Sequence, residues 1–135
     1  MSEHKKLIKG SKILVVDDHR NIRFSLKLAL EHEGAEVDES EDCLQAKEKI
    51  KQAMKDGDCE YQMFFLDIRL PDGSGLDLLK MIAEAGFSSR AVMISGEGTI
   101  NEAFQATQLG AFDYIEKPFI PERILVSVQR CLDFN

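Results

Sequence analysis

The chain has no tryptophan and only three prolines and three cysteines in 135 residues. Cys43, Cys59 and Cys131 are odd in number, lie far apart and form no CxxC pair, so they suggest neither a zinc site nor a redox motif. Free thiols in a reducing compartment are the simplest interpretation. The chain also lacks the roughly 20-residue apolar run of a membrane span and the apolar core of a signal peptide. We therefore expect a cytoplasmic protein that does not bind membranes.

Basic residues are outnumbered, with 17 Lys and Arg against 24 Asp and Glu and a formal net charge of -7. This balance argues against direct nucleic-acid binding, which needs clustered positive charge. One local exception lies near the N-terminus, at His4, Lys5, Lys6, Lys9 and Lys12. We interpret residues 1–11 as a solvated basic arm and residues 12–135 as one domain, long enough to bury its own core.

Short apolar runs alternate with helical patterns along the whole chain. Strands are predicted at residues 12–16, 35–39, 63–66, 91–94 and 111–115, and helices at residues 21–33, 43–54, 76–85, 99–109 and 121–132. This alternation predicts an α/β fold, a doubly wound (βα)5 three-layer sandwich around a parallel sheet. The expected strand order is the flavodoxin-like 2-1-3-4-5.

Five polar side chains are predicted at the carboxyl ends of these strands. Asp17 and Asp18 follow the first strand, Asp67 the third, Ser95 the fourth and Lys117 the fifth. In a doubly wound sheet these ends share one edge, where ligands bind. Three carboxylates there would repel one another without a cation, and Mg²⁺ prefers carboxylate, water and phosphate oxygens. With a lysine and a hydroxyl, the set has the parts needed to transfer a phosphoryl group to a carboxylate.

Each feature alone also has a simpler interpretation. The Asp17–Asp18 pair is compatible with a solvated strand end, Asp67 with a turn former, and Ser95 with ordinary turn chemistry. The occurrence of all of them at successive strand ends outweighs these separate explanations.

The motifs around these residues are the Asp17–Asp18 pair, Asp67 in "FFLDIRLPDGSG", Ser95 in "MISGEGT" and Lys117–Pro118 in "YIEKPF". Together, and in this order, they resemble the receiver domain of bacterial two-component response regulators over residues 12–132. The segments "LPDGSGLDLL" and "ISGEGT" resemble the corresponding segments in receivers of enhancer-binding, sigma-54-type transcriptional activators.

The resemblance implies a role for each site residue. Asp67 would accept a phosphoryl group from a sensor histidine kinase, and the protein would be a phosphoacceptor rather than an enzyme. Lys117 and Ser95 would each bind a phosphoryl oxygen. Mg²⁺ would be held by Asp18 directly, by Asp17 partly through water, and by Asp67 and the backbone carbonyl of Arg69.

The resemblance further implies a conformational switch. Tyr114 stands at the switch-aromatic position, although a plain half-buried sheet aromatic is the alternative. The Lys117–Pro118 bond would be cis. Phosphorylation would change the surface formed by the predicted fourth helix, fifth strand and fifth helix, and a homodimer would form through that surface. The output would be transcription; the alternative is a stand-alone receiver that acts only through protein–protein contacts.

Two further positions border the predicted phosphoryl site. Arg69 and Glu97 lie two residues beyond Asp67 and Ser95. We hypothesise that Arg69 and Glu97 pair across the site and hinder the attacking water; the alternative is two solvated side chains. His19 and His32 are interpreted as surface residues, because the sequence offers neither an acid nor a cysteine partner at metal-ligand spacing.

The sequence disfavours two other functions. A phosphatase of the haloacid-dehalogenase type typically needs a second Asp two residues after its nucleophile, where this chain has Arg69. A non-phosphorylated pseudo-receiver is disfavoured because no site residue is missing. The chain has no phosphate-loop motif and no length left for a helix-turn-helix, so we expect either a stand-alone receiver or a fragment of a transcriptional regulator.

Overall fold

The computed structural model describes residues 8–135. His4, Lys5 and Lys6 of the predicted basic arm therefore lie outside the described residues. Ile8 and Ser11 are both buried, and the Ser11 hydroxyl donates to the Ile8 carbonyl at 2.6 Å. The packed body thus includes residues that precede Lys12, the predicted start of the domain.

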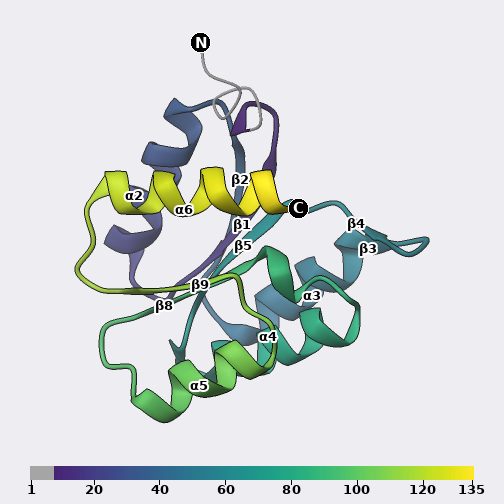
Figure 1. The fold of residues 1–135 in the computed structure, drawn as a ribbon, viewed down its shortest axis with the longest axis vertical. Coiled ribbons are helices and arrows are strands. Elements are labelled where there is room, and N and C mark those ends of the chain that lie inside the picture. Colours follow the sequence, from purple (N-terminus) through teal and green to yellow (C-terminus); the bar gives the residue numbers. More distant parts are fainter. Residues whose placement is uncertain (1–7) are drawn as a thin grey trace.

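A five-stranded parallel sheet forms the middle layer (Figure 1). All neighbouring strands pair in parallel. Their spatial order is β2 (Glu36–Ser40), β1 (Lys12–Val16), β5 (Met63–Asp67), β8 (Ala91–Ser95) and β9 (Asp113–Glu116). The order 2-1-3-4-5 of the core strands and the doubly wound fold class are therefore confirmed.

Helices cover both faces of this sheet (Figure 1). One face packs against α2 (Arg20–His32) and α6 (Pro121–Phe134). The other face packs against α3 (Cys43–Ala53), α4 (Gly75–Glu84) and α5 (Ile100–Gln108). A 3-10 turn, η1 (Ser88–Arg90), leads into β8. No helix within residues 8–135 is long and apolar enough to cross a membrane.

The central strand β5 is buried along its whole length, which explains why its sequence is a continuous apolar run. Met63 and Phe65 belong to the core under α2 and α6, whereas Phe64 and Leu66 belong to the core under α3, α4 and α5. Successive side chains of a strand point to opposite faces, so a strand covered on both sides needs apolar residues throughout. Burying Asp67 at the end of this strand is the exception to that rule.

The last strand differs from its prediction. It was expected at residues 111–115 but begins at Asp113 and ends at Glu116. The backbone N–H of Ala111 donates to the Ala106 carbonyl at 3.0 Å, so Ala111 still belongs to the turn that ends α5. The apolar run therefore starts before the strand does. The second strand is likewise shifted by one residue, to Glu36–Ser40.

Two short antiparallel hairpins were not predicted. One joins β3 (Met54–Lys55) to β4 (Asp58–Cys59) after α3, and the other joins β6 (Arg69–Leu70) to β7 (Gly73–Ser74) after the central strand. The second hairpin contains residues that immediately follow Asp67. It therefore forms one wall of the region at the carboxyl ends of the strands.

The helix predicted from residue 99 begins one residue later, at Ile100, and Thr99 is its N-cap. The Thr99 hydroxyl accepts from the backbone N–H of Glu102 at 3.1 Å, and the Glu102 carboxylate accepts from the backbone N–H of Thr99 at 3.0 Å. This capping box satisfies two backbone donors that no helical bond reaches. It also holds the Glu102 carboxylate at the end of the helix that faces the strand ends.

Asp113 joins the edge strand β9 to α6. Its carboxylate accepts from the Arg123 guanidinium at 2.9 and 3.2 Å and from the Ser127 hydroxyl at 2.9 Å. Burial raises the pKa of Asp113, but bonds from Arg123, the Tyr114 backbone N–H and Ser127 together lower it below 3.8. Such a carboxylate stabilises the fold above its unfolded pKa, and this contribution is lost as the pH falls through its lower folded pKa.

We predict that Asp113→Asn lowers the free energy of unfolding by about 1 kcal/mol at neutral pH, because the charge that Arg123 binds is removed. The difference between wild type and variant should shrink when the pH is lowered below the ordinary Asp value. Urea unfolding at neutral and acidic pH measures this. A deficit that is equally large under both conditions would contradict the role of the charge.

Candidate functional site

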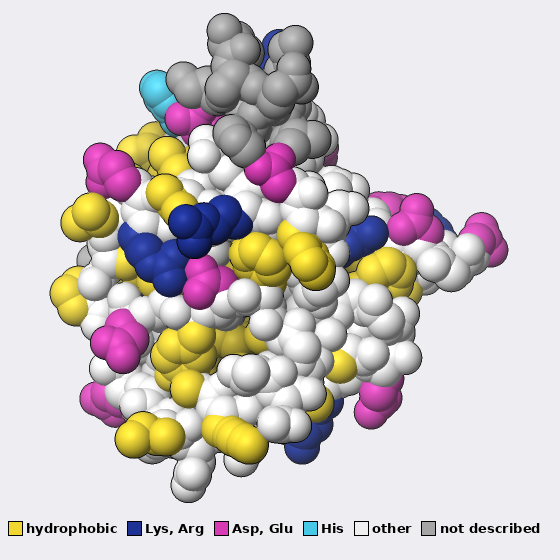
Figure 2. All heavy atoms as spheres, viewed as in Figure 1, with side chains coloured by type: hydrophobic (Ala, Val, Ile, Leu, Met, Phe, Trp, Pro, Cys, Tyr) yellow, Lys and Arg dark blue, Asp and Glu magenta, His cyan; other side chains and the backbone are white. Residues whose placement is uncertain are grey.

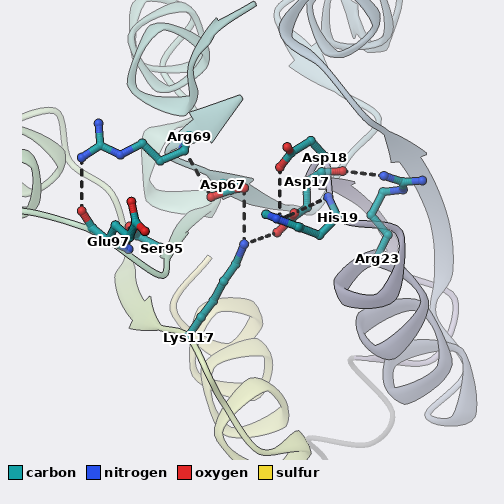
Figure 3. Close-up of polar contacts among 9 residues, drawn as sticks. All are labelled: Asp17, Asp18, His19, Arg23, Asp67, Arg69, Ser95, Glu97 and Lys117. Carbon is teal, nitrogen blue, oxygen red and sulfur yellow. Dashed lines mark hydrogen bonds and ion pairs between the residues drawn. The ribbon is translucent and has the colours of Figure 1, made fainter. Parts of the chain in front are cut away.

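The carboxyl ends of the strands bring the predicted polar residues together (Figure 3). Asp17 follows β1, Asp67 and Ser95 are the last residues of β5 and β8, and Lys117 follows β9. Asp17, Asp67 and Ser95 are 0, 2 and 1% exposed, whereas Asp18 lies at the surface. The chain therefore buries two carboxylates next to each other at one edge of its sheet.

Lys117 lies between the two buried carboxylates (Figure 3). Its Nζ is 2.8 Å from Asp17 Oδ2 and 3.3 Å from Asp67 Oδ2. Its backbone N–H donates to the Ser95 carbonyl at 2.8 Å, which fixes the chain after β9 against the end of β8. The Lys117–Pro118 peptide bond is cis. One ammonium thus partly neutralises two acids that would otherwise repel each other.

The acidic pocket is suited to a divalent cation. Ligand atoms of Asp17, Asp18, His19 and Asp67 all lie within 4.8 Å of one another. Asp17 Oδ2 is fully buried and lies 2.8 Å from the Lys117 ammonium. One ammonium shared by two buried carboxylates leaves a net negative charge, which fits a site whose cation binds oxygen ligands. These residues therefore fit Mg²⁺.

The environment of Asp67 disfavours its charged form. Burial, followed by the negative charge of Asp17, raises the pKa of Asp67 from 3.8 to about 6. The charge of Lys117 and a 3.4 Å hydrogen bond from the Arg69 backbone N–H act in the opposite direction. The ionised carboxylate of Asp67 is thus held at a cost in stability.

His19 was not recognised as part of this cluster. Its side chain is exposed, as expected, but Nδ1 lies 3.2 Å from Asp17 Oδ1 and 3.2 Å from Asp18 Oδ1. The expectation that His19 has no acid partner at ligand spacing is therefore wrong. The backbone N–H of His19 donates to Asp17 Oδ1 at 2.8 Å, and this local turn folds the imidazole back over the acids. Its position directly after the acid pair was the available sequence signal.

The hypothesis that Arg69 and Glu97 pair through their side chains needs correction. Arg69 Nη2 donates to the backbone carbonyl of Glu97 at 3.1 Å, and its ion-pair partner is Glu102, with Oε1 at 3.0 Å. Glu102 is available because the capping box already points its carboxylate towards the residues before α5. Figure 3 shows the contact of Arg69 with Glu97, and the ion pair with Glu102 connects the loop after Asp67 to the start of α5.

Tyr114 occupies a space that Gly98 leaves open. The ring is half-buried, and the hydroxyl is buried without a hydrogen-bond partner in the described structure. A Cβ on Gly98 would overlap the Tyr114 hydroxyl and would lie 2.9 Å from Ser95 Oγ. Ser95 Oγ itself accepts from the backbone N–H of Glu97 at 3.3 Å. The aromatic side chain and the site hydroxyl therefore share one small region.

The loop after Asp67 is anchored to a neighbouring helix. The Asp72 carboxylate accepts from the backbone N–H groups of Cys43 and Leu44 at 2.7 and 3.0 Å, at the start of α3. These bonds lower the pKa of Asp72. At Gly75 a side chain would overlap the backbone carbonyl of Asp67, so α4 begins against the strand that carries the buried acid. Both features hold the peptide that follows Asp67 in place.

The family model described as "Response regulator receiver domain" matches residues 13–129. The chain belongs to this family. It is a receiver domain, a signalling domain and not a classical enzyme, and its acidic pocket of Asp17, Asp18 and Asp67 is consistent with the metal site of receivers.

Individual relatives support this assignment. The receiver is 34% identical over 123 residues to the chemotaxis protein CheY of Bacillus subtilis, covering 90% of this chain and 98% of CheY. It is 33% identical over 107 residues to the response regulator protein PilR of Pseudomonas aeruginosa, covering 79% of this chain and 23% of PilR. This chain spans half or less of the length of the transcriptional regulators among its relatives.

A solved structure is similar across nearly the whole receiver. The beryllofluoride-activated NtrC4 receiver domain dimer superposes with a TM-score of 0.79 at 32% identity, covering 91% of this chain and 97% of that one. Receivers of sigma-54-type activators are thus among the relatives, as the motif sequences indicated.

We predict that Asp67→Asn stabilises the receiver at neutral pH in the presence of EDTA. The raised pKa means that the native state holds the Asp67 proton more tightly, so stability falls as pH rises from 3.8 to about 6. Removing the charge should raise the free energy of unfolding by about 1 to 2 kcal/mol. The gain is limited because Lys117 loses one of its two partners at the same time. Urea unfolding measures the gain, and a less stable variant at neutral pH would contradict the account of the pocket.

We predict that Gly98→Ala forces the Tyr114 ring out of its present position, because the new methyl group would overlap the hydroxyl. Nitration by tetranitromethane, followed by peptide mass mapping, should show faster modification of Tyr114. Tyr61, which is 3% exposed, serves as the internal reference.

Gly96→Ala is the matched control for this experiment, because a Cβ there would meet Lys117 side-chain carbons at an ordinary 3.7 Å. Equal nitration of Tyr114 in the two glycine variants would show that Gly98 does not determine the position of the ring.

Proposed function

We propose that this receiver accepts a phosphoryl group on Asp67 from a sensor histidine kinase, in a reaction that depends on Mg²⁺. The observation that carries the proposal is the buried Asp67 carboxylate, held beside the ammonium of Lys117 and the carboxylate of Asp17. A cavity of about 220 Å³ opens onto Asp67 and is lined by His19, Asp67, Arg69, Gly96, Glu97 and Lys117. The cationic side chains of Lys117 and Arg69 in its lining suit a phosphoryl group.

The transfer needs one bond to form and one to break. An oxygen of Asp67 would bond to phosphorus while the phosphorus–nitrogen bond of the kinase phosphohistidine breaks, and the histidine nitrogen recovers its electron pair. Lys117 would hold a phosphoryl oxygen, since its Nζ already lies 3.3 Å from Asp67 Oδ2. Ser95 would hold another oxygen through its hydroxyl.

The metal would be held by Asp18 directly and by Asp17 partly through water. Asp67 and the backbone carbonyl of Arg69 would supply the remaining protein oxygens. When bound, Mg²⁺ supplies positive charge to the phosphoryl oxygens and to the three acids. The chain's contribution is to bury Asp17 and Asp67 and to keep Lys117 between them.

The response would be a population shift at the surface of α5, β9 and α6, the elements called the fourth helix, fifth strand and fifth helix in the sequence prediction. Ser95 and Tyr114 lie close together at Gly98, so a movement of the Ser95 hydroxyl towards the phosphoryl group would change the room available to the Tyr114 ring. A modification shifts such an equilibrium only as far as it favours one arrangement over the other.

A homodimer through this surface is part of the proposal. Ile100 and Phe104 of α5 are 90 and 51% exposed, and Val126 of α6 is 43% exposed. Hydrophobic side chains reach the surface in the view in which α6 and α5 face the reader (Figure 2). The NtrC4 receiver is described as a dimer, which supports a dimer of this chain without specifying the surface.

The output would be transcription, as in the relatives AlgB and DctD, whose names describe transcriptional regulatory proteins. A stand-alone receiver that acts through protein contacts is the second candidate, favoured by the coverage of 98% of CheY. The cytoplasmic location and the lack of direct nucleic-acid binding by this chain stay predictions from the sequence.

We predict that incubation with Mg²⁺ and acetyl phosphate adds a single phosphoryl group to the chain, measured as intact mass. Asp67→Asn, and wild type with EDTA, should show no such adduct. Beryllofluoride, which does not hydrolyse, should bind wild type under the same conditions. A chain that gives neither a phosphoryl adduct nor beryllofluoride binding would contradict the proposed function.

A further inference from the structure

His19 projects an exposed imidazole over the acidic pocket (Figure 3). The ring is 67% exposed, yet its Nδ1 is 3.2 Å from one carboxylate oxygen of Asp17 and 3.2 Å from one of Asp18. The ring is placed by the 2.8 Å bond from its own backbone N–H to Asp17 Oδ1. A freely solvated surface histidine would not need this arrangement.

The two equal distances match those between ligands of one metal ion. Ligand atoms about 2.1 Å from a metal in octahedral geometry lie about 3 Å from their neighbours. Nδ1 lies equally far from an oxygen of each acid, so it faces the pair rather than one of them. The nitrogen therefore lies at the spacing of an adjacent ligand from one oxygen of each acid.

The charge around the pocket also calls for a cation. Asp17, Asp18 and Asp67 face the single ammonium of Lys117, whose Nζ lies 2.8 Å from Asp17 Oδ2 and 3.3 Å from Asp67 Oδ2. Two guanidinium groups near the pocket are used elsewhere: Arg69 binds Glu102, and Arg23 binds Glu39 and the Asp17 backbone carbonyl. Neither of them neutralises the carboxylates.

The geometry points to His19 as an additional ligand that gives this metal site a preference for a divalent transition metal, such as Co²⁺, over Mg²⁺. Imidazole suits transition metals, whereas Mg²⁺ selects hard oxygen ligands. His19 would thus change which ion occupies the pocket without changing the acids. The inference rests on the proposed function only in placing a metal among these three carboxylates.

The test is calorimetric titration of the whole chain with MgCl₂ and with CoCl₂, in wild type, His19→Gln and His32→Gln. His32 is an exposed histidine at the end of α2 and is the matched control. We expect His19→Gln to weaken Co²⁺ binding about tenfold while Mg²⁺ binding changes less than about twofold. His32→Gln should leave both affinities unchanged.

A second readout reports the ligand itself. In the Co²⁺ complex a coordinated imidazole gives a contact-shifted N–H proton resonance, which should be present in wild type and in His32→Gln and absent in His19→Gln. An equal loss of Co²⁺ and Mg²⁺ affinity in His19→Gln, or no contact-shifted resonance in wild type, would overturn the inference.

Failure of this inference is distinguishable from failure of the proposed function. Phosphorylation of His19→Gln by acetyl phosphate with Mg²⁺ tests the function without the imidazole. A phosphorylated variant that retains its full Co²⁺ affinity would overturn the role of His19 alone. A wild-type chain that prefers Co²⁺ through His19 but is never phosphorylated and binds no beryllofluoride would overturn the proposed function alone.

Discussion

The contact of one lysine with two buried carboxylates is the interaction on which this site depends. Lys117 follows the edge strand β9 and still reaches Asp17 and Asp67. Strands β1, β5 and β9 must therefore all end at the same level. The doubly wound order brings this about, because β1 and β5 are neighbours and β8 connects β5 to β9. Without the ammonium, two desolvated negative charges would face each other.

The surroundings of this contact keep it in place from two sides. On one side, the hairpin after Asp67 is held to α3 through Asp72. On the other, the backbone of Lys117 is bonded to the end of β8, and Arg69 connects the Asp67 loop to the start of α5. A charge placed on Asp67 would therefore act on groups that already reach towards α5.

The sequence predicted most of the architecture because both-sided burial leaves an unmistakable pattern. Runs such as residues 63–66 are apolar at every position only when helices cover both faces of a strand. The register of β9 was less predictable, because Ala111 and Phe112 look like strand residues while Ala111 completes the turn after α5. The hairpin at β6 and β7 was not predictable from periodicity, because it is only two residues long on each side.

The residues of the site were predictable from the sequence, but the directions in which their side chains point were not. Asp17, Asp67, Ser95 and Lys117 lie at strand ends, which sequence position alone locates. The partner of Arg69 was missed, because the choice between Glu97 and Glu102 depends on how α5 begins. The imidazole of His19 was missed for a similar reason, since a local turn reverses the side chain towards the acids.

The two edge strands of the sheet bear on how the chain can associate. β2 exposes Glu36 and β9 exposes Glu116, whereas Glu39 and Asp113 are paired with arginines, so each edge strand carries one exposed carboxylate. Like charges on an exposed edge discourage a second sheet from pairing there. Growth of the sheet from one molecule to the next is thus disfavoured by the strands themselves, and contact between copies is left to helices, where exposed apolar side chains such as Ile100 and Phe104 occur.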